Sequence, residues 1–136
     1  MSEGLVVDTS ALLASAFAEP QRDAVLVALS EAAEVRMSAA CLLEGSIVAQ
    51  ARLGPQGQAE FALLLNAFGI EVVSLTPELA TLAGEAWERW GKGRHPAGLN
   101  IVDCCSYALA AYDGAPLLAV GDDFARTDLP VVRLII

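Results

Sequence analysis

Short apolar runs alternate along the chain with longer segments in which apolar residues recur every three or four positions. Short runs rich in branched residues are typical of buried strands, and the longer period is typical of helices. The pattern predicts strands at 4–8, 35–38, 70–75, 115–120 and 131–136. It predicts helices at 10–18, 21–33, 39–53, 56–68, 77–90 and 100–112. Because strands alternate with helices, we expect an α/β fold with a central, mostly parallel sheet of four to five strands and helices on both faces.

Residues with helix-capping side chains stand at three predicted helix starts. Their oxygens can accept hydrogen bonds from the free backbone N–H groups of the first turn. These residues are Ser38, Thr76 and Asn100. Gly54-Pro55 separates the two helices at 39–53 and 56–68. Trp87 and Trp90 share a helix face with apolar residues, so both are predicted to lie in the core.

The composition is that of a compact protein with a large core. The chain has 136 residues, of which 55% are hydrophobic and 18% charged, so one domain is expected. No stretch reaches the roughly 18 apolar residues of a membrane span, and no basic segment precedes an apolar run at the N-terminus. The three cysteines have no metal-binding spacing, which predicts reduced, buried thiols in a cytoplasmic protein.

The apolar content also exceeds what a lone monomer needs, which favours a partner surface. The apolar helices at 10–18 and 24–33 carry little charge and are predicted to bind either a segment of a protein partner or a second copy of the chain. The net charge of −9 argues against non-specific electrostatic binding to nucleic acid. It leaves room for a site at which a bound metal inverts the local field.

Acidic residues follow two of the predicted strands. Asp8 ends the first strand, and Asp122 and Asp123 follow the strand at 115–120. In open α/β sheets, ligands bind in the crevice at the carboxyl ends of the strands. Asp8 can alternatively act only as the N-cap of the helix that begins directly after it.

Two further acids lie on predicted helices. Asp103 stands three residues after Asn100, where it can complete a capping box or face the crevice. Glu44 lies within the apolar stripe of its helix, in line with Ala40 and Ile47. A buried carboxylate is costly unless it is paired or binds a cation, although a Glu at the rim of a core is the alternative. Several acids at one crevice therefore predict a hard cation such as Mg²⁺ or Mn²⁺, which commonly serves phosphate chemistry.

Four segments resemble the PIN-domain ribonucleases, and specifically the VapC-like toxins of type II toxin–antitoxin systems. They are VVDTSALLA, SAACLLEGSIV, GKGRHPAGLNIVDCCSYALA and LLAVGDDFARTDL, and the third is long and specific. The resemblance covers essentially the whole chain and implies a single PIN-like domain over residues 1–136. It also implies a Mg²⁺- or Mn²⁺-dependent endoribonuclease and a cognate antitoxin that blocks its active site.

The resemblance implies a cluster of acids at the active site. Carried over to this chain, the acids are Asp8, Glu44, Asp103 and, as the fourth, Asp122. The segment GDDF also offers Asp123 for the fourth position, and Asp128 is close in sequence. Asp8 and Asp103 are expected to bind the metal directly. Glu44 and Asp122 would complete the negative pocket, bind a second ion or orient the attacking water.

Hydroxyl and basic side chains complete the predicted site. Thr9 and Ser10 follow Asp8, and one of their hydroxyls can bond the Asp8 carboxylate or a metal-bound water. A cluster of basic residues immediately precedes the helix that carries Asp103. Its members are Arg89, Lys92, Arg94 and His95. We hypothesise that this cluster contacts RNA phosphates. The alternative is a solvated loop in which Arg89 pairs with Glu85, and His95 as a general base is a weaker hypothesis.

Other classes of function fit the sequence less well. A phosphatase with an aspartyl nucleophile typically needs a D-x-D pair after the first strand, and this chain has DTS there. A phospho-acceptor signalling domain needs a lysine after a late strand, whereas the only lysine, Lys92, precedes a helix. A non-catalytic PIN-fold module that binds RNA or a partner is the remaining alternative, and four intact acids argue against it.

Overall fold

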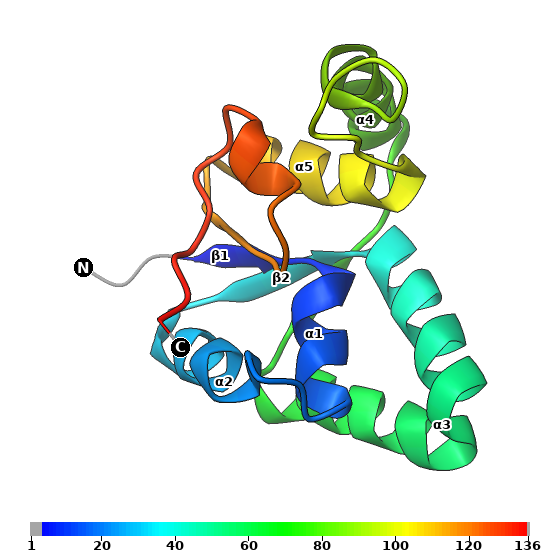
Figure 1. The fold of residues 1–136 in the computed structure, drawn as a ribbon, viewed down its shortest axis with the longest axis vertical. Coiled ribbons are helices and arrows are strands. Elements are labelled where there is room, and N and C mark those ends of the chain that lie inside the picture. The colour runs from blue at the N-terminus through cyan, green and yellow to red at the C-terminus, as the bar shows by residue number, and fades with distance from the viewer. Residues whose placement is uncertain (1–3, 136) are drawn as a thin grey trace.

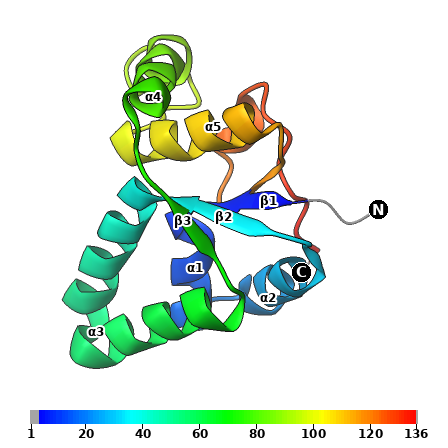
Figure 2. The same ribbon diagram turned by 180° about the vertical axis from the view of Figure 1, so that it is seen from behind.

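Four parallel strands form the centre of the molecule. The computed structural model describes residues 4–135, and Figures 1 and 2 show its fold. The strand order is β3-β2-β1-β4. The strands are β1 (Leu5–Val7), β2 (Val35–Ser38), β3 (Glu71–Val73) and β4 (Leu117–Leu118). Every neighbouring pair is parallel, so all four carboxyl ends meet at one edge, as predicted from the alternating pattern.

Helices cover both faces of the sheet. On one face lie α4 (Pro77–Trp90) and α5 (Ile101–Asp113). On the other lie α1 (Thr9–Ala16), α2 (Arg22–Glu31) and α3 (Ala39–Ala67), as both views show. The side chains of β1 alternate between two cores, because Val6 packs with the α4–α5 layer while Leu5 and Val7 pack with α1 and α2. The predicted α/β class with helices on both faces is confirmed.

Capping side chains fix the starts of three helices, as predicted. Ser38 Oγ accepts from the N–H of Ala40 at 3.2 Å, and Thr76 Oγ1 accepts from the N–H of Leu79 at 3.1 Å. Asn100 forms a reciprocal capping box at the start of α5. None of the helices within residues 4–135 is long and apolar enough to cross a membrane.

The long helix α3 consists of two arms joined at Gly54, where the backbone adopts φ 62° and ψ −149°. After the bend the second arm runs across beneath α1 towards β3, as the ribbon shows (Figures 1 and 2). A Cβ atom at Gly45 would lie 2.2 Å from Cζ of Phe61, so the absence of a side chain there lets Phe61 reach the core. The predicted break between two helices is therefore confirmed, and Glu44 lies on the arm that precedes it.

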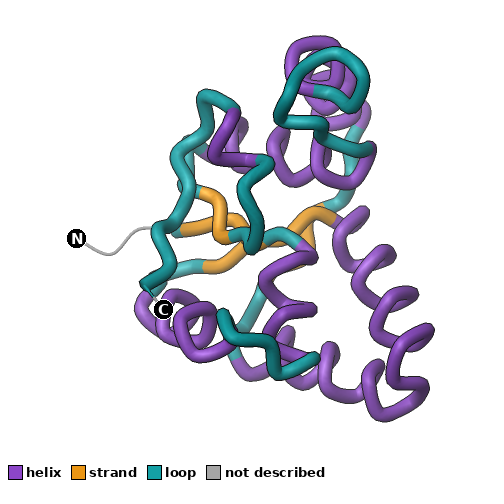
Figure 3. The backbone as a smooth tube through the Cα atoms, viewed as in Figure 1, coloured by secondary structure: helices purple, strands orange, loops and turns teal. Residues whose placement is uncertain are grey.

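The C-terminal segment differs from the sequence-based expectation of a strand at 131–136. In the described part of this segment, residues 131–135, Val131 alone forms a bridge, to Leu117, and residue 136 lies outside the described residues. Pro130 contributes its carbonyl to the N–H of Leu117 but has no N–H of its own, which limits a continuous ladder. Figure 3 shows the chain after β4 as loop, interrupted by the short 3-10 helix η1 (Phe124–Arg126).

The prediction that both tryptophans lie in the core is wrong for Trp87, which is 41% exposed, while Trp90 is half-buried. The buried stripe of α4 runs through Leu79, Ala83 and Ala86. Trp87 lies one position further round the helix, about 100° from Ala86. There it covers Gly91, where a Cβ atom would approach the indole within 2.4 Å.

Candidate active site

Asp8 lies at the carboxyl end of β1 and is only 3% exposed. Its Oδ2 atom accepts two hydrogen bonds from Ser10, from the backbone N–H at 3.0 Å and from the hydroxyl at 2.7 Å. The first bond makes Asp8 the N-cap of α1, as one sequence hypothesis held. The Ser10 hydroxyl also accepts from the N–H of Val120 at 3.0 Å, which ties Asp8 to the segment after β4.

The other oxygen of Asp8 faces two side chains from different helices. Ser106 on α5 donates its hydroxyl to Oδ1 at 2.5 Å, and Cys41 Sγ on α3 lies 3.8 Å from the same oxygen. Cys41 Sγ is also 2.9 Å from Ser106 Oγ. Burial raises the pKa of the Cys41 thiol to about 12, with a further contribution from the charge of Asp8, so the sulfur keeps its proton. Neither Ser106 nor Cys41 was singled out from the sequence as part of the site.

Asp103 occupies the first turn of α5 and forms the predicted capping box. Its N–H donates to Asn100 Oδ1 at 2.8 Å, and its Oδ2 accepts from the N–H of Asn100 at 3.0 Å. Burial raises its pKa to about 6, against the lowering effect of the bond from Asn100. The charges of Asp8, Asp123 and Glu44 raise this pKa further, so the capping role and the crevice role coexist.

These electrostatic effects show which acids the fold brings together. Asp8, Glu44 and Asp103 come from β1, α3 and α5, and their approach was predicted from the sequence. The GDDF segment contributes Asp123, whose charge acts on Asp103. Asp122, the residue carried over as the fourth acid, is exposed, and its role stays a prediction. Glu44 is half-buried, with exposed apolar neighbours at Leu43 and Ile47.

The donor chemistry of the cluster fits a hard cation. Within residues 4–135, no group of three or more His, Cys, Asp or Glu side chains is placed to share one ion. Mg²⁺ retains several waters and commonly binds through one or two carboxylates, so it does not require a group of three such side chains. Oδ1 of Asp8 has one short hydrogen bond and one long sulfur contact, which leaves it capacity to bind a cation. A cation beside Asp103 would also relieve the repulsion that raises its pKa.

The two hydroxyl residues after Asp8 have different roles. Ser10 bonds the carboxylate of Asp8 in the manner that the resemblance suggested. Thr9 is buried, and its hydroxyl donates to the backbone carbonyl of Cys41 at 3.4 Å. Thr9 therefore ties α1 to α3 beside the site, while Ser10 orients the acid.

The basic cluster surrounds a loop that is closed by a bridge between Gly91 and Leu99. Arg89 contacts Asp128 at 3.5 Å, rather than Glu85 as the solvated-loop alternative held. Its guanidinium also lies over the ring of Trp90. Arg94 donates Nε–H to the carbonyl of Glu88 at 3.0 Å and lies over the ring of Trp87, 4.9 Å from the centroid.

The remaining members of the cluster differ in how firmly they are held. Lys92 is exposed. His95 accepts from the N–H of Ala97 through Nδ1 at 3.0 Å and packs edge-on against Trp90, which is a structural role. Arg126, which the sequence analysis missed, donates to the carbonyl of Pro96 at 3.4 Å. Because Arg126 ends η1, which begins directly after Asp123, this contact joins the basic loop to the acidic segment.

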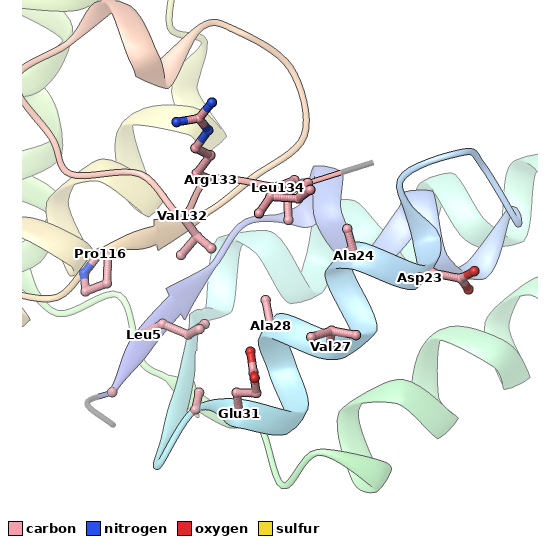
Figure 4. A pocket seen from close by; sticks show the side chains of 13 residues that line it. Leu5, Asp23, Ala24, Val27, Ala28, Glu31, Pro116, Val132, Arg133 and Leu134 are labelled. Atoms are coloured by element: carbon pink, nitrogen blue, oxygen red, sulfur yellow. The ribbon is translucent and has the colours of Figure 1, made fainter. Parts of the chain in front are cut away.

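A pocket elsewhere on the surface is unrelated to the acids. Figure 4 shows that it lies between α2, the start of β1 and the C-terminal segment, where Val27 and Ala28 face Leu5 and Val132. Its wall includes Gly4 before β1 and Pro116 before β4. It is therefore at the amino ends of the strands, opposite the edge that carries Asp8.

The fold agrees with comparisons to known proteins. The family model described as PIN domain matches residues 5–129. The chain is 43% identical over 131 residues to ribonuclease VapC30 of Mycobacterium tuberculosis, covering 96% of this chain and 99% of that protein. It is 41% identical over 129 residues to ribonuclease VapC of Mycolicibacterium smegmatis, covering 95% and 100%. The chain therefore belongs to the PIN-domain family, in its VapC ribonuclease group, as the resemblance predicted.

Solved structures support the same fold. The chain matches Mycobacterium tuberculosis VapC20, described as a sarcin-ricin loop cleaving toxin, with a TM-score of 0.78 and 21% identity over 95% of this chain and 98% of that one. It matches VapBC2 of Rickettsia felis, bound to a DNA fragment from its promoter, with a TM-score of 0.74 and 13% identity over 96% and 97%.

Proposed function

We propose that this protein is a Mg²⁺- or Mn²⁺-dependent endoribonuclease toxin of a type II toxin–antitoxin module. The observation that carries the proposal is the convergence of Asp8, Glu44, Asp103 and Asp123 at the carboxyl edge of a parallel sheet, with the pKa of Asp103 raised to about 6. Like charges crowded in this way favour a bound cation. The similarity to proteins named VapC ribonuclease supports RNA as the substrate.

In the proposed mechanism, Asp8 and Asp103 would hold the cation. Ser10 and Ser106 bond opposite oxygens of Asp8 and keep its carboxylate oriented. When bound, the ion supplies positive charge that stabilises the phosphate in the transition state. In this proposal, Glu44 and the fourth acid would complete the negative pocket, bind a second ion, or orient a water molecule for attack and accept its proton.

The basic loop supplies the contacts for the RNA backbone in this proposal. Arg89, Lys92 and Arg94 are exposed, and each can meet a phosphate in a chain with few cations. Arg126 extends this positive surface towards Asp123. His95 serves as a packing residue of the loop, because its ring contacts Trp90 and its Nδ1 accepts a hydrogen bond from the N–H of Ala97.

The proposed partners are a cognate antitoxin and a second copy of the chain. Several structural neighbours are toxin–antitoxin complexes, among them one from Klebsiella pneumoniae, which supports an antitoxin. Of the two helices predicted to bind partners, α1 is mostly buried, so the structure leaves α2 as the candidate, with Val27 exposed beside the pocket of Figure 4. An apolar groove between α4 and α5, where Ile101 is 80% exposed, is a candidate homodimer surface. We also place the protein in the cytoplasm, a compartment that suits three free, buried cysteines.

The proposal is tested by cleavage of a total RNA pool with antitoxin-free protein in Mg²⁺, in Mn²⁺ and in EDTA. Wild type is compared with Asp8→Asn, and Asp23→Asn on the exposed face of α2 serves as the matched control. We expect cutting at discrete sites that requires the metal, falls by more than about 100-fold in Asp8→Asn and is unchanged in Asp23→Asn. If folded, metal-supplied wild type leaves the RNA intact, the proposal fails and a non-catalytic binding module becomes the better account.

A further inference from the structure

We propose that Ser106, supported from behind by Cys41, is a positioning residue that fixes the Asp8 carboxylate for cation binding. This inference rests on the proposed role of Asp8 as a ligand. Ser106 does not itself touch the ion or the RNA in this account. It acts through its hydrogen bond to Oδ1 of Asp8.

The contact joins residues that are far apart in sequence. Ser106 lies on α5 and Asp8 lies after β1, and the hydroxyl donates to the carboxylate at 2.5 Å. A hydroxyl has one proton, and this one is used on Asp8. The Cys41 thiol also has one proton, and two acceptors lie near it: the Ser106 oxygen at 2.9 Å and Oδ1 of Asp8 at 3.8 Å. We assign the proton to the shorter contact, with the Cys41 thiol as donor and the Ser106 oxygen as acceptor. The result is a directed chain from Cys41 on α3, through Ser106, to Asp8.

Both oxygens of Asp8 are held from different directions. Ser10 bonds Oδ2 through its N–H and its hydroxyl, and Ser106 bonds Oδ1. Rotation about the last side-chain torsion of Asp is otherwise broad, because it joins tetrahedral and planar atoms. Ser10 alone anchors one oxygen, so the position of Oδ1 depends on Ser106. The long Cys41 contact leaves Oδ1 accessible to a cation.

The burial of Ser106 argues that its hydroxyl is retained for this contact. Ser106 is 0% exposed and lies in an unbroken run of buried residues, Cys104–Ala110. An apolar residue would fill such a place without the cost of burying a hydroxyl. Groups that orient a metal ligand from behind commonly change metal affinity or activity by 10- to 100-fold when removed.

The test measures binding of Mn²⁺ alone to the full chain by isothermal titration calorimetry, far below the unfolding temperature of each variant. Ser106→Ala removes the hydroxyl, and Ala110→Gly weakens the same helix one turn away without contact to Asp8. We expect Ser106→Ala to raise the Mn²⁺ dissociation constant about 10-fold or more, and Ala110→Gly to leave it within about twofold of wild type. RNA cleavage is then measured against Mn²⁺ concentration, and Ser106→Ala should raise the half-saturating concentration.

Variants of Cys41 test the second step of the chain. Cys41→Ser keeps a donor behind Ser106 and should retain Mn²⁺ affinity, whereas Cys41→Ala should weaken it less than Ser106→Ala does. Because Cys41 is argued to act through Ser106, the two alanine substitutions should combine less than additively. Equal losses in Cys41→Ser and Cys41→Ala, or full additivity, would overturn the role of Cys41.

The outcomes separate this inference from the proposed function. Unchanged Mn²⁺ affinity in a folded Ser106→Ala protein overturns the inference even if wild type cuts RNA. Lost affinity in Ser106→Ala, combined with a wild type that binds Mn²⁺ but cuts no RNA, supports the inference and overturns the nuclease. If Ser106→Ala does not fold, the test is the Mn²⁺ affinity of Cys41→Ala compared with that of Cys41→Ser. If both variants bind Mn²⁺ as tightly as wild type does, the proposed positioning role of Ser106 and Cys41 is overturned. A wild type that binds no Mn²⁺ overturns the inference as well.

Discussion

Replacing Asp103 with Asn should stabilise the cation-free protein while it abolishes RNA cleavage. The Asp103 carboxyl group is partly buried, and its pKa is raised from 3.8 to about 6, first by burial and then by Asp8, Asp123 and Glu44. An Asn side chain keeps an oxygen that can accept from the N–H of Asn100. It removes the charge that the fold disfavours, so the variant loses function and gains stability.

The magnitude follows from the pKa change. At about 1.36 kcal/mol per unit, a rise from 3.8 to about 6 corresponds to roughly 3 kcal/mol of destabilisation when the carboxylate is charged. Solvent reaches part of this group and screens its neighbours, so we expect about 1 to 2 kcal/mol at pH 7.5. The folded state holds the proton more tightly than the unfolded chain between pH 3.8 and 6, so the free energy of unfolding falls through this window as pH rises.

The assay is urea unfolding of wild type and Asp103→Asn at pH 4 and pH 7.5, in EDTA. The difference between the two proteins isolates Asp103 from the other acids, and it should be larger at pH 7.5. Added Mg²⁺ should then stabilise wild type and leave Asp103→Asn nearly unchanged. A variant that is no more stable than wild type at pH 7.5, with an equal pH dependence, would refute the idea that crowded carboxylates destabilise this site.

Four further substitutions test other parts of the structure. Gly45→Ala should lower the free energy of unfolding by about 1 to 3 kcal/mol, measured by urea unfolding, because the new Cβ atom would overlap the ring of Phe61; unchanged stability would show that the two arms of α3 can separate. Asp123→Asn should reduce RNA cleavage by about 10-fold or more, while Asp122→Asn has a smaller effect, because the charge of Asp123 acts on the cluster; the reverse order would restore Asp122 as the fourth acid. Arg94→Glu should weaken cleavage and make the remaining cleavage less sensitive to added salt, because one phosphate contact is lost, while Mn²⁺ affinity is retained; unchanged cleavage would leave Arg94 as a loop residue that packs on Trp87.

Local signals explain why most of the fold could be predicted from the sequence. The helix starts at Ser38, Thr76 and Asn100 are set by side chains that bond the first turn, and this chemistry is readable from single residues. The placement of acids after strands was readable for the same reason, because parallel strands deliver their carboxyl ends to one edge. The missing C-terminal strand and the exposed Trp87 depend on what packs against each segment, which periodicity does not specify.

The sequence by itself determined the α/β class and the family, because these depend on periodicity, capping and specific motifs. It also supplied Asp8, Glu44 and Asp103 as the predicted acids of the site. Only the tertiary structure decided which neighbours those acids meet. In the folded protein, Asp123 is the acid of the GDDF segment whose charge raises the pKa of Asp103. Ser106 contacts the carboxylate of Asp8, and Cys41 contacts Ser106. A hydrogen bond between residues 98 positions apart forms only after β1, α3 and α5 pack together. Its partners are therefore fixed by the packing of the core and leave no local pattern in the chain.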